Sequence, residues 1–354
     1  MAEINITLNT QKKPKTPDDQ LGFGKFFTDH MFVMDYYRGK GWVDPRIVPY
    51  APLTMEPSCA CLHYGQEVFE GMKAYRHPDG SAALFRPELN FERLNLSCDR
   101  LCIPTLDVDF ALEALKKLVD IDQDWIPTSP GTSLYIRPFV IAADDCLGIK
   151  ITDHFMFMII MSPVGPYYKG GIKPVGIFVE TEYVRAARGG VGHTKTGGNY
   201  AASLKSLDKA LALGYSQVLW LDASERKYIE EVGAMNVFFK IDGEIITPAL
   251  SGSILSGITR RSCIEMLSAW GYPVSEKRLS IDEVMAAGKD GRLEEVFGTG
   301  TAAVISSVGS LRCGDDIATV ADGQIGTVTQ KLYDNLVGIQ TGTVTDSFGW
   351  TIKV

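Results

Sequence analysis

The chain has 354 residues, more than a single hydrophobic core usually serves, so its length predicts two domains. A hydrophobic content of 45% with 22% charged residues is typical of a soluble globular protein. The formal net charge of -8 argues against nucleic acid or an anionic membrane as the main partner.

The cysteines and the N-terminus bear on compartment and metal binding. An odd, sparse set of cysteines indicates reduced thiols, and no spacing repeats as it does in a zinc ribbon, so we expect no metal site. The N-terminus lacks a basic start followed by an apolar run, and the apolar stretch 155–161 is too short to span a bilayer. These features predict a cytoplasmic protein. The cysteines are Cys59, Cys61, Cys98, Cys102, Cys146, Cys263 and Cys313.

The first half of the chain mixes strands and helices. About 20 polar, proline-bearing residues form an expected arm, and Pro87 is suited to the first position of a helix because its missing N–H costs nothing there. Grouped strands and helices of this kind favour an α+β domain. In order, we predict strands at 31–36 and 82–85, helices from Pro87 to before Pro104 and at 109–121, and strands at 133–142 and 155–161.

The segment 164–175 is rich in proline and glycine and is the best interdomain linker in the chain. It separates an N-terminal domain, residues 1–163, from a C-terminal domain, residues 176–354. In order, the second half predicts a strand at 175–179, a helix at 200–213, a strand at 217–221, a hairpin turn at Asp242-Gly243, a capping-box helix from Ser280, and strands near 296, 303–308 and 325.

A glycine-rich stretch at 189–200 surrounds one lysine, Lys195. Five glycines in twelve residues bury nothing and suit a sharp turn or the close approach of a ligand. A lysine confined there is a candidate for a depressed pKa and a nucleophilic amine. Taken alone, the stretch fits a solvated lysine on a mobile loop better, because loops are exposed by default.

A phosphate-bearing pyridine aldehyde would need a lysine, a donor near its ring oxygen, a carboxylate near its ring nitrogen and an anion site. Tyr200 begins the helix after Lys195, Glu231 ends a polar pair before an apolar strand, and Arg86 precedes Pro87. Each has an alternative interpretation. Glu231 fits a solvated charge at a strand end, and Arg86 fits a surface residue.

Two further segments fit anion cradles. Residues 253–260, with Thr259, precede a helix and could bind a phosphate, although taken alone they fit an ordinary Ser/Thr cap better. Residues 297–303 match G-x-G-x-x-A, but a strand composition follows, whereas a dinucleotide-binding loop opens a helix. Thr194 rather than glycine precedes Lys195, which excludes a Walker A loop. We therefore do not expect nucleotide binding.

The run Gly192-His193-Thr194-Lys195-Thr196-Gly197-Gly198-Asn199-Tyr200 resembles the Schiff-base segment of the branched-chain amino acid aminotransferases, pyridoxal 5'-phosphate (PLP) enzymes of fold type IV. The resemblance implies an α+β two-domain fold, with a smaller N-terminal α/β domain and a larger C-terminal pseudo-barrel domain. It covers nearly the whole chain. The further blocks that resemble the family are 27–31, 62–74, 84–87, 133–138, 231–236 and 297–302.

The resemblance implies a role for each site residue. Lys195 carries the Schiff base and moves the proton at the substrate α-carbon, Glu231 pairs with the pyridine nitrogen, and Tyr200 pairs with the ring oxygen. The phosphate ligands are Arg86, Ile258, Thr259 and Thr301. The residues implied for the substrate are Phe23, Tyr64, Phe69, Tyr135, Arg137, Ala234, Thr301 and Ala302, with Leu147 and Ile149 of the partner subunit. Among these, Arg137 with Tyr64 suits the second carboxylate of glutamate.

By the same resemblance, the activity is ping-pong transamination of L-leucine, L-isoleucine and L-valine with 2-oxoglutarate by a homodimer. The chain departs from some members in having no CxxC pair after 297–302 and Ala234 in place of threonine. Relatives of the same fold that act on D-amino acids or aminodeoxychorismate are usually shorter and lack the Tyr-x-Arg-Pro context of Tyr135. A non-catalytic phosphate-binding module would not need Lys195.

Overall fold

The computed structural model describes residues 3–167 and 171–354, and the chain divides into two compact units. The first comprises Met1–Tyr167, Thr194–Gly197 and Gly338–Val354, and the second comprises Tyr168–His193 and Gly198–Val337. The first boundary falls within the linker that the sequence predicts. Two segments depart from the expected division. Thr194–Gly197, which includes Lys195, and Gly338–Val354 both join the first unit. The first unit is therefore the larger of the two.

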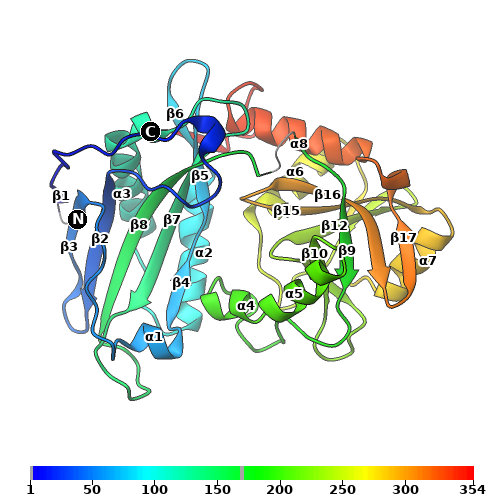
Figure 1. Cartoon of the computed structure of the whole chain (residues 1–354), viewed down its shortest axis with the longest axis horizontal. Coiled ribbons are helices and arrows are strands. Elements are labelled where there is room, and N and C mark those ends of the chain that lie inside the picture. The colour runs from blue at the N-terminus through cyan, green and yellow to red at the C-terminus, as the bar shows by residue number, and fades with distance from the viewer. Residues whose placement is uncertain (1–2, 168–170) are drawn as a thin grey trace. The chain divides into compact units, whose positions relative to one another are not determined.

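Within the described residues, the first unit is built on a nine-stranded sheet of order β1-β3-β2-β8-β7-β5-β6-β18, with β4 paired to β7 (Figure 1). The neighbours β1 and β3 are parallel and the other pairs are antiparallel. The pairing of β18 with β6 carries the C-terminus into this unit. The strands are β1 (Asn5–Ile6), β2 (His30–Tyr37), β3 (Gly41–Pro49), β4 (Glu67–Phe69), β5 (Met72–Arg76), β6 (Ala82–Phe85), β7 (Ser133–Ala142), β8 (His154–Val164) and β18 (Thr351–Lys353).

Two long helices, α2 (Pro87–Arg100) and α3 (Val108–Ile121), lie along one face of this sheet (Figure 1). Both agree with the predicted helices, and the core between helices and sheet includes Leu94, Leu115 and Phe157. Side chains alternate between the faces of a strand. On β7, Leu134 and Ile136 enter this core, so Tyr135 and Arg137 point to the opposite face. A short helix, α1 (Ala60–Tyr64), precedes β4.

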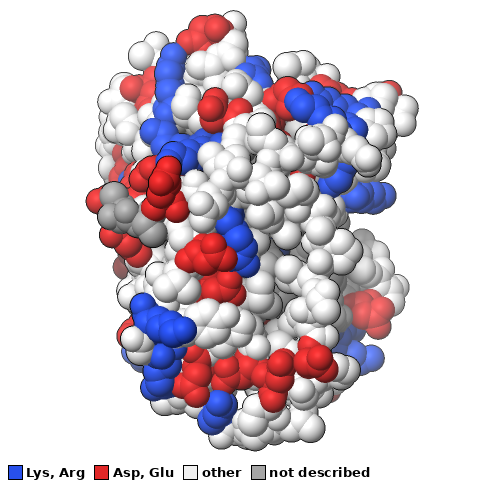
Figure 2. Space-filling view, turned by 90° about the vertical axis from the view of Figure 1, so that its left-hand side faces the viewer, with Lys and Arg blue, Asp and Glu red and all other residues white. Residues whose placement is uncertain are grey.

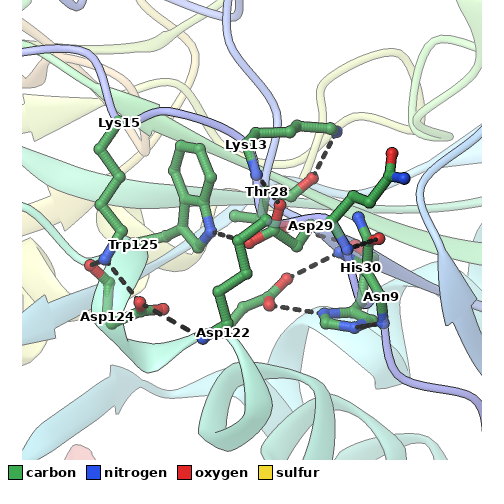
Figure 3. Close-up of polar contacts among 11 residues, drawn as sticks. Asn9, Lys13, Lys15, Thr28, Asp29, His30, Asp122, Asp124 and Trp125 are labelled. Carbon is green, nitrogen blue, oxygen red and sulfur yellow. Dashed lines mark hydrogen bonds and ion pairs between the residues drawn. The ribbon is translucent and has the colours of Figure 1, made fainter.

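The N-terminal arm is held against the first unit by the buried polar cluster drawn in Figure 3. The backbone N–H of Asn9 donates to Nε2 of His30 at 2.8 Å, and Nδ1 of His30 lies 2.7 Å from the Asp122 carboxylate. Because Nε2 accepts a hydrogen bond, the ring proton sits on Nδ1 and is donated to Asp122. The Lys13 backbone donates to Asp29 at 2.9 Å. The expected polar arm is therefore anchored by specific bonds.

Charges of both signs are spread over the face drawn in Figure 2, and several patches of opposite sign lie side by side. Exposed pairs such as Lys15 with Asp124 and Lys353 with Asp79 bring opposite charges together on the surface of this unit. That face offers no extended basic area of the kind that binds a phosphate backbone.

The sheet of the second unit also has nine strands in the part of the chain that the structure describes, in the order β11-β10-β9-β16-β15-β12-β13-β14, with β17 paired to β16. Parallel and antiparallel pairs are mixed, since β9 runs parallel to β10 and to β16. The strands are β9 (Val175–Val179), β10 (Gln217–Leu221), β11 (Ile229–Val232), β12 (Asn236–Ile241), β13 (Glu244–Thr247), β14 (Val274–Glu276), β15 (Leu293–Gly300), β16 (Val304–Cys313) and β17 (Asp316–Thr319).

The hairpin at Asp242-Gly243 and the capping box of Ser280 with Glu283 are confirmed. The helix predicted at 200–213 is instead interrupted, because Ser203 Oγ donates to the Tyr200 carbonyl at 2.7 Å. The helices that involve this unit are α4 (Gly197–Ala201), α5 (Leu204–Ala212), α6 (Ile258–Ala269), α7 (Ile281–Lys289) and α8 (Thr327–Gln340).

The strand predicted near residue 325 is absent from the described structure, because that residue leads into α8. The carboxylate of Glu295 accepts hydrogen bonds from the backbone N–H groups of Val328 and Thr329, at 3.1 and 2.8 Å. These bonds satisfy donors in the first turn of α8 and fix where the helix begins. No helix in residues 3–167 or 171–354 is long and apolar enough to cross a membrane.

Candidate active site

Lys195 lies in a short segment that is clamped between α2 and β4 of the first unit. Its backbone N–H donates to Ser97 Oγ and its carbonyl accepts from the Phe69 N–H, both at 3.0 Å. The Glu67 carboxylate accepts a hydrogen bond from the Gly197 N–H. The alternative of a mobile surface loop is therefore wrong for this part of the stretch.

Two glycines of the stretch are needed for close approach. A Cβ on Gly197 would lie 2.6 Å from Glu67 Oε1, which would break the clamp. A Cβ on Gly192 would lie 2.4 Å from the Ser253 carbonyl oxygen, within the second unit. The Ser253 carbonyl belongs to the backbone, so glycine is required at position 192, whereas at position 197 a side chain would displace the Glu67 carboxylate from its hydrogen bond.

Lys195 is half-buried, and desolvation of its amine is the main reason why the pKa of Lys195 is lowered. The positive charges of Arg93 and Arg137 lower the pKa further, whereas Glu70 and Tyr135 raise it. The ammonium nitrogen lies 5.0 Å from the centre of the Phe69 ring. A lowered pKa increases the fraction of neutral amine, the form that acts as nucleophile and base.

Glu70 and Arg93 form a buried ion pair that the sequence analysis missed. Arg93 Nε lies 2.7 Å from Glu70 Oε1 and its Nη2 lies 2.8 Å from Oε2. Asn90 Nδ2 and the Gly71 N–H also donate to Glu70, at 2.8 and 3.1 Å. Burial alone would raise the pKa of Glu70, but the charge and bonds of Arg93 outweigh it and the pKa is lowered. The sequence did contain a signal for this pair. Glu70 lies within an apolar stretch, and Asn90 and Arg93 follow at helical spacing.

Four of the residues predicted to bind substrate meet on the sheet face opposite the helices. Arg137 Nη2 donates to Tyr135 Oη at 2.9 Å, and the guanidinium lies 4.6 Å from the centre of the Phe69 ring. The Phe23 ring meets Tyr135 edge-on, with centroids 4.9 Å apart. The group combines an apolar surface with one fixed positive charge. A Cβ on Gly71 would lie 2.1 Å from Tyr135 Oη, so this glycine makes room for the tyrosine.

Three other predicted substrate residues lie around α1 and the loop after β7. Tyr64 Oη donates to the Leu147 carbonyl of the same chain. Leu147 and Ile149 are exposed in the single chain, Ile149 at 87%. A cavity of about 430 Å³ opens here and is lined by Tyr64 and Ile149 among others.

Arg86 is buried rather than a surface residue, with 6% of its area exposed. It precedes α2 in a left-handed conformation with a φ of 48°, which is uncommon for a residue with a side chain. Its guanidinium stacks on Trp350 at 4.9 Å from the ring centre, and its N–H donates to the Trp350 carbonyl at 2.8 Å. The C-terminal segment therefore fixes the position of this arginine.

In the second unit, Glu231 lies on β11 and is only 4% exposed, so it is not a solvated charge at a strand end. Its Oε1 accepts from the Leu255 N–H at 2.8 Å, and its Oε2 lies 3.3 Å from Arg185 Nε. Arg185 also donates to the Ser253 carbonyl. The sequence offered no signal for Arg185, because it lies in a loop without periodicity.

The N-terminus of α6 is free of a side-chain cap. The N-cap residue is Gly257, so the alternative of a Ser/Thr cap is wrong, and Ile258 and Thr259 form the first turn. A Cβ on Gly257 would lie 1.9 Å from Asn236 Oδ1, while Asn236 Nδ2 donates to the Leu255 carbonyl at 2.9 Å. Backbone N–H groups at such a terminus suit an anion.

The remaining predicted residues lie in turns or in α4. Thr301 and Ala302 connect β15 to β16, and Ala234 connects β11 to β12. Because Asn236 pairs with Thr299 across β12 and β15, these two turns are neighbours. Tyr200 lies in α4, directly after the lysine segment.

Comparisons with known proteins agree with this arrangement. The family model "Amino-transferase class IV" matches residues 67–311. The chain is 59% identical to "Branched-chain-amino-acid aminotransferase 2" of Bacillus subtilis (strain 168), over 99% of this chain and 97% of that protein. The solved Escherichia coli branched-chain amino acid aminotransferase superposes with a TM-score of 0.74 at 28% identity, covering 90% of this chain and 98% of that one. The T.th. branched-chain amino acid aminotransferase, solved with pyridoxamine 5'-phosphate, gives 0.73 at 26% identity, covering 90% and 97%.

The residues of the chain fit PLP. Lys195 supplies an amine of lowered pKa, Glu231 a buried carboxylate, and α6 an uncapped N-terminus. Among the described residues, the buried Oγ1 of Thr299, two positions before Thr301, has no hydrogen-bond partner and is available to a ligand. The cofactor is accordingly pyridoxal 5'-phosphate, as in the family. The chain belongs to the class IV aminotransferases, α+β enzymes of fold type IV, and among them to the branched-chain-amino-acid transaminases.

Proposed function

We propose that the enzyme transfers the amino group of L-leucine, L-isoleucine and L-valine to 2-oxoglutarate. The products are the branched-chain 2-oxo acids and L-glutamate, and the reaction is ping-pong through a Schiff base on Lys195. The observation that carries the proposal is the Lys195 backbone held by Ser97 and Phe69, with an amine of lowered pKa. The names of the relatives support the branched-chain substrates.

When bound, PLP supplies an electron sink for the negative charge that forms on the substrate α-carbon. Lys195 takes the proton from that carbon and returns it, since a lowered pKa increases the fraction of neutral amine that can act as a base. The Phe69 ring, 5.0 Å from the Lys195 nitrogen, offers an apolar surface beside this proton.

The buried groups of the second unit hold the cofactor in this proposal. Glu231 holds a proton at the pyridine nitrogen, and Arg185 and the Leu255 N–H keep its carboxylate fixed. The first turn of α6, with Ile258 and Thr259, binds the phosphate. The other proposed cofactor contacts are Arg86 and Thr301 at the phosphate and Tyr200 at the ring oxygen.

Substrate recognition divides into a polar and an apolar part. Arg137 is held over Phe69 and by Tyr135, and it suits the second carboxylate of glutamate, with Tyr64 assisting. Phe23 and Phe69 offer the apolar surface that branched aliphatic side chains require. Ala234 completes that surface, and the Thr301-Ala302 amides with Tyr135 orient the α-carboxylate.

We propose a cytoplasmic homodimer. The high exposure of Leu147 and Ile149 in the single chain supports a role for these residues in the partner subunit's substrate site. All seven cysteines lie in the described residues and are free thiols, which suits a reducing compartment.

The test combines spectroscopy with a half-reaction assay. The purified protein is expected to show visible absorbance that borohydride abolishes, and Lys195→Ala is expected to lose both this signal and turnover. Lys240→Ala is a matched control, since Lys240 lies on β12 in an ion pair with Glu294 and is expected to leave both intact. A panel of L- and D-amino acids identifies the substrates, and full turnover by Lys195→Ala contradicts the mechanism.

A further inference from the structure

One face of α2 contacts both Glu70 and the lysine segment. Asn90, Arg93 and Ser97 lie three and four residues apart, so they share that face of the helix. Asn90 and Arg93 bond to the carboxylate of Glu70, and Ser97 accepts the N–H of Lys195. A single rigid helix therefore fixes the position of the ion pair relative to the lysine backbone.

The ion pair lies deep in the first unit, with Glu70 0% and Arg93 8% exposed. A buried ion pair contributes little net stability, because the cost of desolvating both charges offsets their attraction. Buried charges are screened only weakly, so the pair acts on a charged group nearby. Lys195 is such a group, because its backbone bonds to Ser97 on the helix of Arg93 and to Phe69 next to Glu70.

Charged and titratable groups of the first unit act on Lys195 from several elements. Arg93 and Arg137 disfavour its ammonium form, and Glu70 and Tyr135 favour it. Glu67 contacts the same segment through Gly197. Among the charged groups, Arg93 has the largest effect on the pKa of Lys195, which it lowers, and Glu70 raises the same pKa. The two residues of the ion pair therefore act in opposite directions on one nitrogen.

We propose that Glu70 and Arg93 are positioning residues that together set the protonation of the Lys195 nitrogen, each charge offsetting the other. This inference rests on the proposed Schiff-base role of Lys195. Neither residue touches the substrate in the proposal. The carboxylate favours a proton on the nitrogen, the guanidinium opposes it, and the bidentate pair keeps the two effects in balance.

The experiment measures how the visible absorbance of the holoenzyme changes with pH in Glu70→Gln, Arg93→Gln and the double variant. Glu70→Gln leaves Arg93 unopposed and is expected to lower the midpoint of the titration by roughly one pH unit. Arg93→Gln leaves Glu70 unopposed and is expected to raise it by about the same amount. The double variant removes both charges and is expected to return close to the wild-type midpoint.

Two controls separate this effect from a structural one. Arg93→Lys keeps the positive charge and is expected to keep the midpoint, even where turnover falls. Arg46→Gln breaks the ion pair between Arg46 and Asp35, on β3 and β2, and is expected to leave the midpoint unchanged. A loss of packing alone would move both single variants in the same direction or leave both midpoints in place.

Shifts in the same direction, or no shifts, would overturn the inference while the absorbance itself upholds the proposed function. A wild-type protein without borohydride-sensitive absorbance would overturn both. If Glu70→Gln does not fold, Arg93→Gln decides alone, because Glu70 keeps its bonds to Asn90 and Gly71 there. An unchanged or lowered midpoint in Arg93→Gln contradicts the inference.

Discussion

The backbone N–H of Lys195 donates a hydrogen bond of 3.0 Å to the side chain of Ser97, which precedes it by 98 residues in the chain. A second bond, from the Phe69 N–H to the Lys195 carbonyl, holds the other side of the same residue. The main chain of the lysine is therefore fixed by α2 and β4 before any ligand binds. Such preorganisation limits the movement of the amine during proton transfer.

Replacing Ser97 with alanine removes the acceptor of the Lys195 N–H and is expected to destabilise the protein by about 1–3 kcal/mol, because a buried donor is left unpaired. Turnover is expected to fall more than substrate affinity, since the lysine backbone is then less well fixed. Thermal unfolding and steady-state kinetics measure both effects.

The matched control is Ser206→Ala. Ser206 is also fully buried, but its Oγ has no hydrogen-bond partner among the described residues. Its removal is expected to be neutral or stabilising. Equal losses of stability in the two variants would show that the hydrogen bond between Ser97 and the Lys195 N–H does not account for the loss.

Glu67 gives a prediction about pH. Burial raises the pKa of Glu67 above its ordinary value of 4.5, although bonds from Gly197 and Thr196 and the charge of Arg137 oppose the rise. An acid whose pKa is higher in the folded state lowers the stability as pH rises from its unfolded pKa to its folded pKa, because the unfolded chain loses the proton first. This loss of folding stability is absent below about pH 4.5, where Glu67 is protonated in both the folded and the unfolded chain.

Glu67→Gln stays neutral and keeps an acceptor oxygen for the Gly197 N–H. Its melting temperature is expected to equal that of the wild type near about pH 4 and to exceed it near about pH 7. Thermal melts over this range measure the difference. A variant that is less stable at neutral pH, or a difference that does not change with pH, contradicts this account.

The sequence predicted the elements with a strong local signal. Pro87 marked the start of α2, the Asp242-Gly243 pair marked a hairpin, and the capping box of Ser280 marked α7. Each signal arises from the backbone of a few adjacent residues, so no tertiary contact can override it easily.

Contacts between distant residues were not predictable in the same way. The start of α8 depends on Glu295, which lies on a strand more than 30 residues earlier in the chain. The site shows the same limit. Lys195 was found from its glycine-rich stretch, whereas Arg93 and Arg185 become visible only once Glu70 and Glu231 are placed beside them.

Gly71→Ala tests the space reserved for Tyr135. The new Cβ would lie 2.1 Å from Tyr135 Oη and 3.0 Å from its Cζ, so the ring has to move and the bond between its Oη and Arg137 is lost. We expect the Michaelis constant to rise roughly tenfold, the effect of losing one hydrogen bond that involves a charged group. The overall fold is expected to persist, because the ring lies on the face opposite the helical core.

The matched comparison is Gly71→Ala in a Tyr135→Phe background. Removing the hydroxyl relieves the closest contact, so the alanine is expected to cost less there than in the wild type. Kinetics of the two single variants and the double variant measure the coupling. Strictly additive losses would mean that the glycine serves some other purpose.

The polar cluster of Figure 3 predicts that Asp122 anchors the N-terminal arm. Its carboxylate accepts from both the backbone N–H and Nδ1 of His30, at 2.9 and 2.7 Å, and His30 in turn accepts the Asn9 N–H. Asp122→Ala leaves these buried donors unpaired and is expected to cost about 2–4 kcal/mol. Freed from this anchor, the arm is expected to be cut by trypsin after Lys12 or Lys15 well before the rest of the protein unfolds.

Asp124→Ala is the control within the same cluster, because Asp124 meets Lys15 at 2.6 Å but is 45% exposed at its side chain. Exposed pairs contribute about 0–1 kcal/mol, so this variant is expected to keep both its melting temperature and its resistance to trypsin. Denaturant unfolding and timed digestion compare the two variants. If Asp124→Ala releases the arm as readily as Asp122→Ala, the arm is held by its exposed lysines, and the buried bonds to His30 are not its anchor.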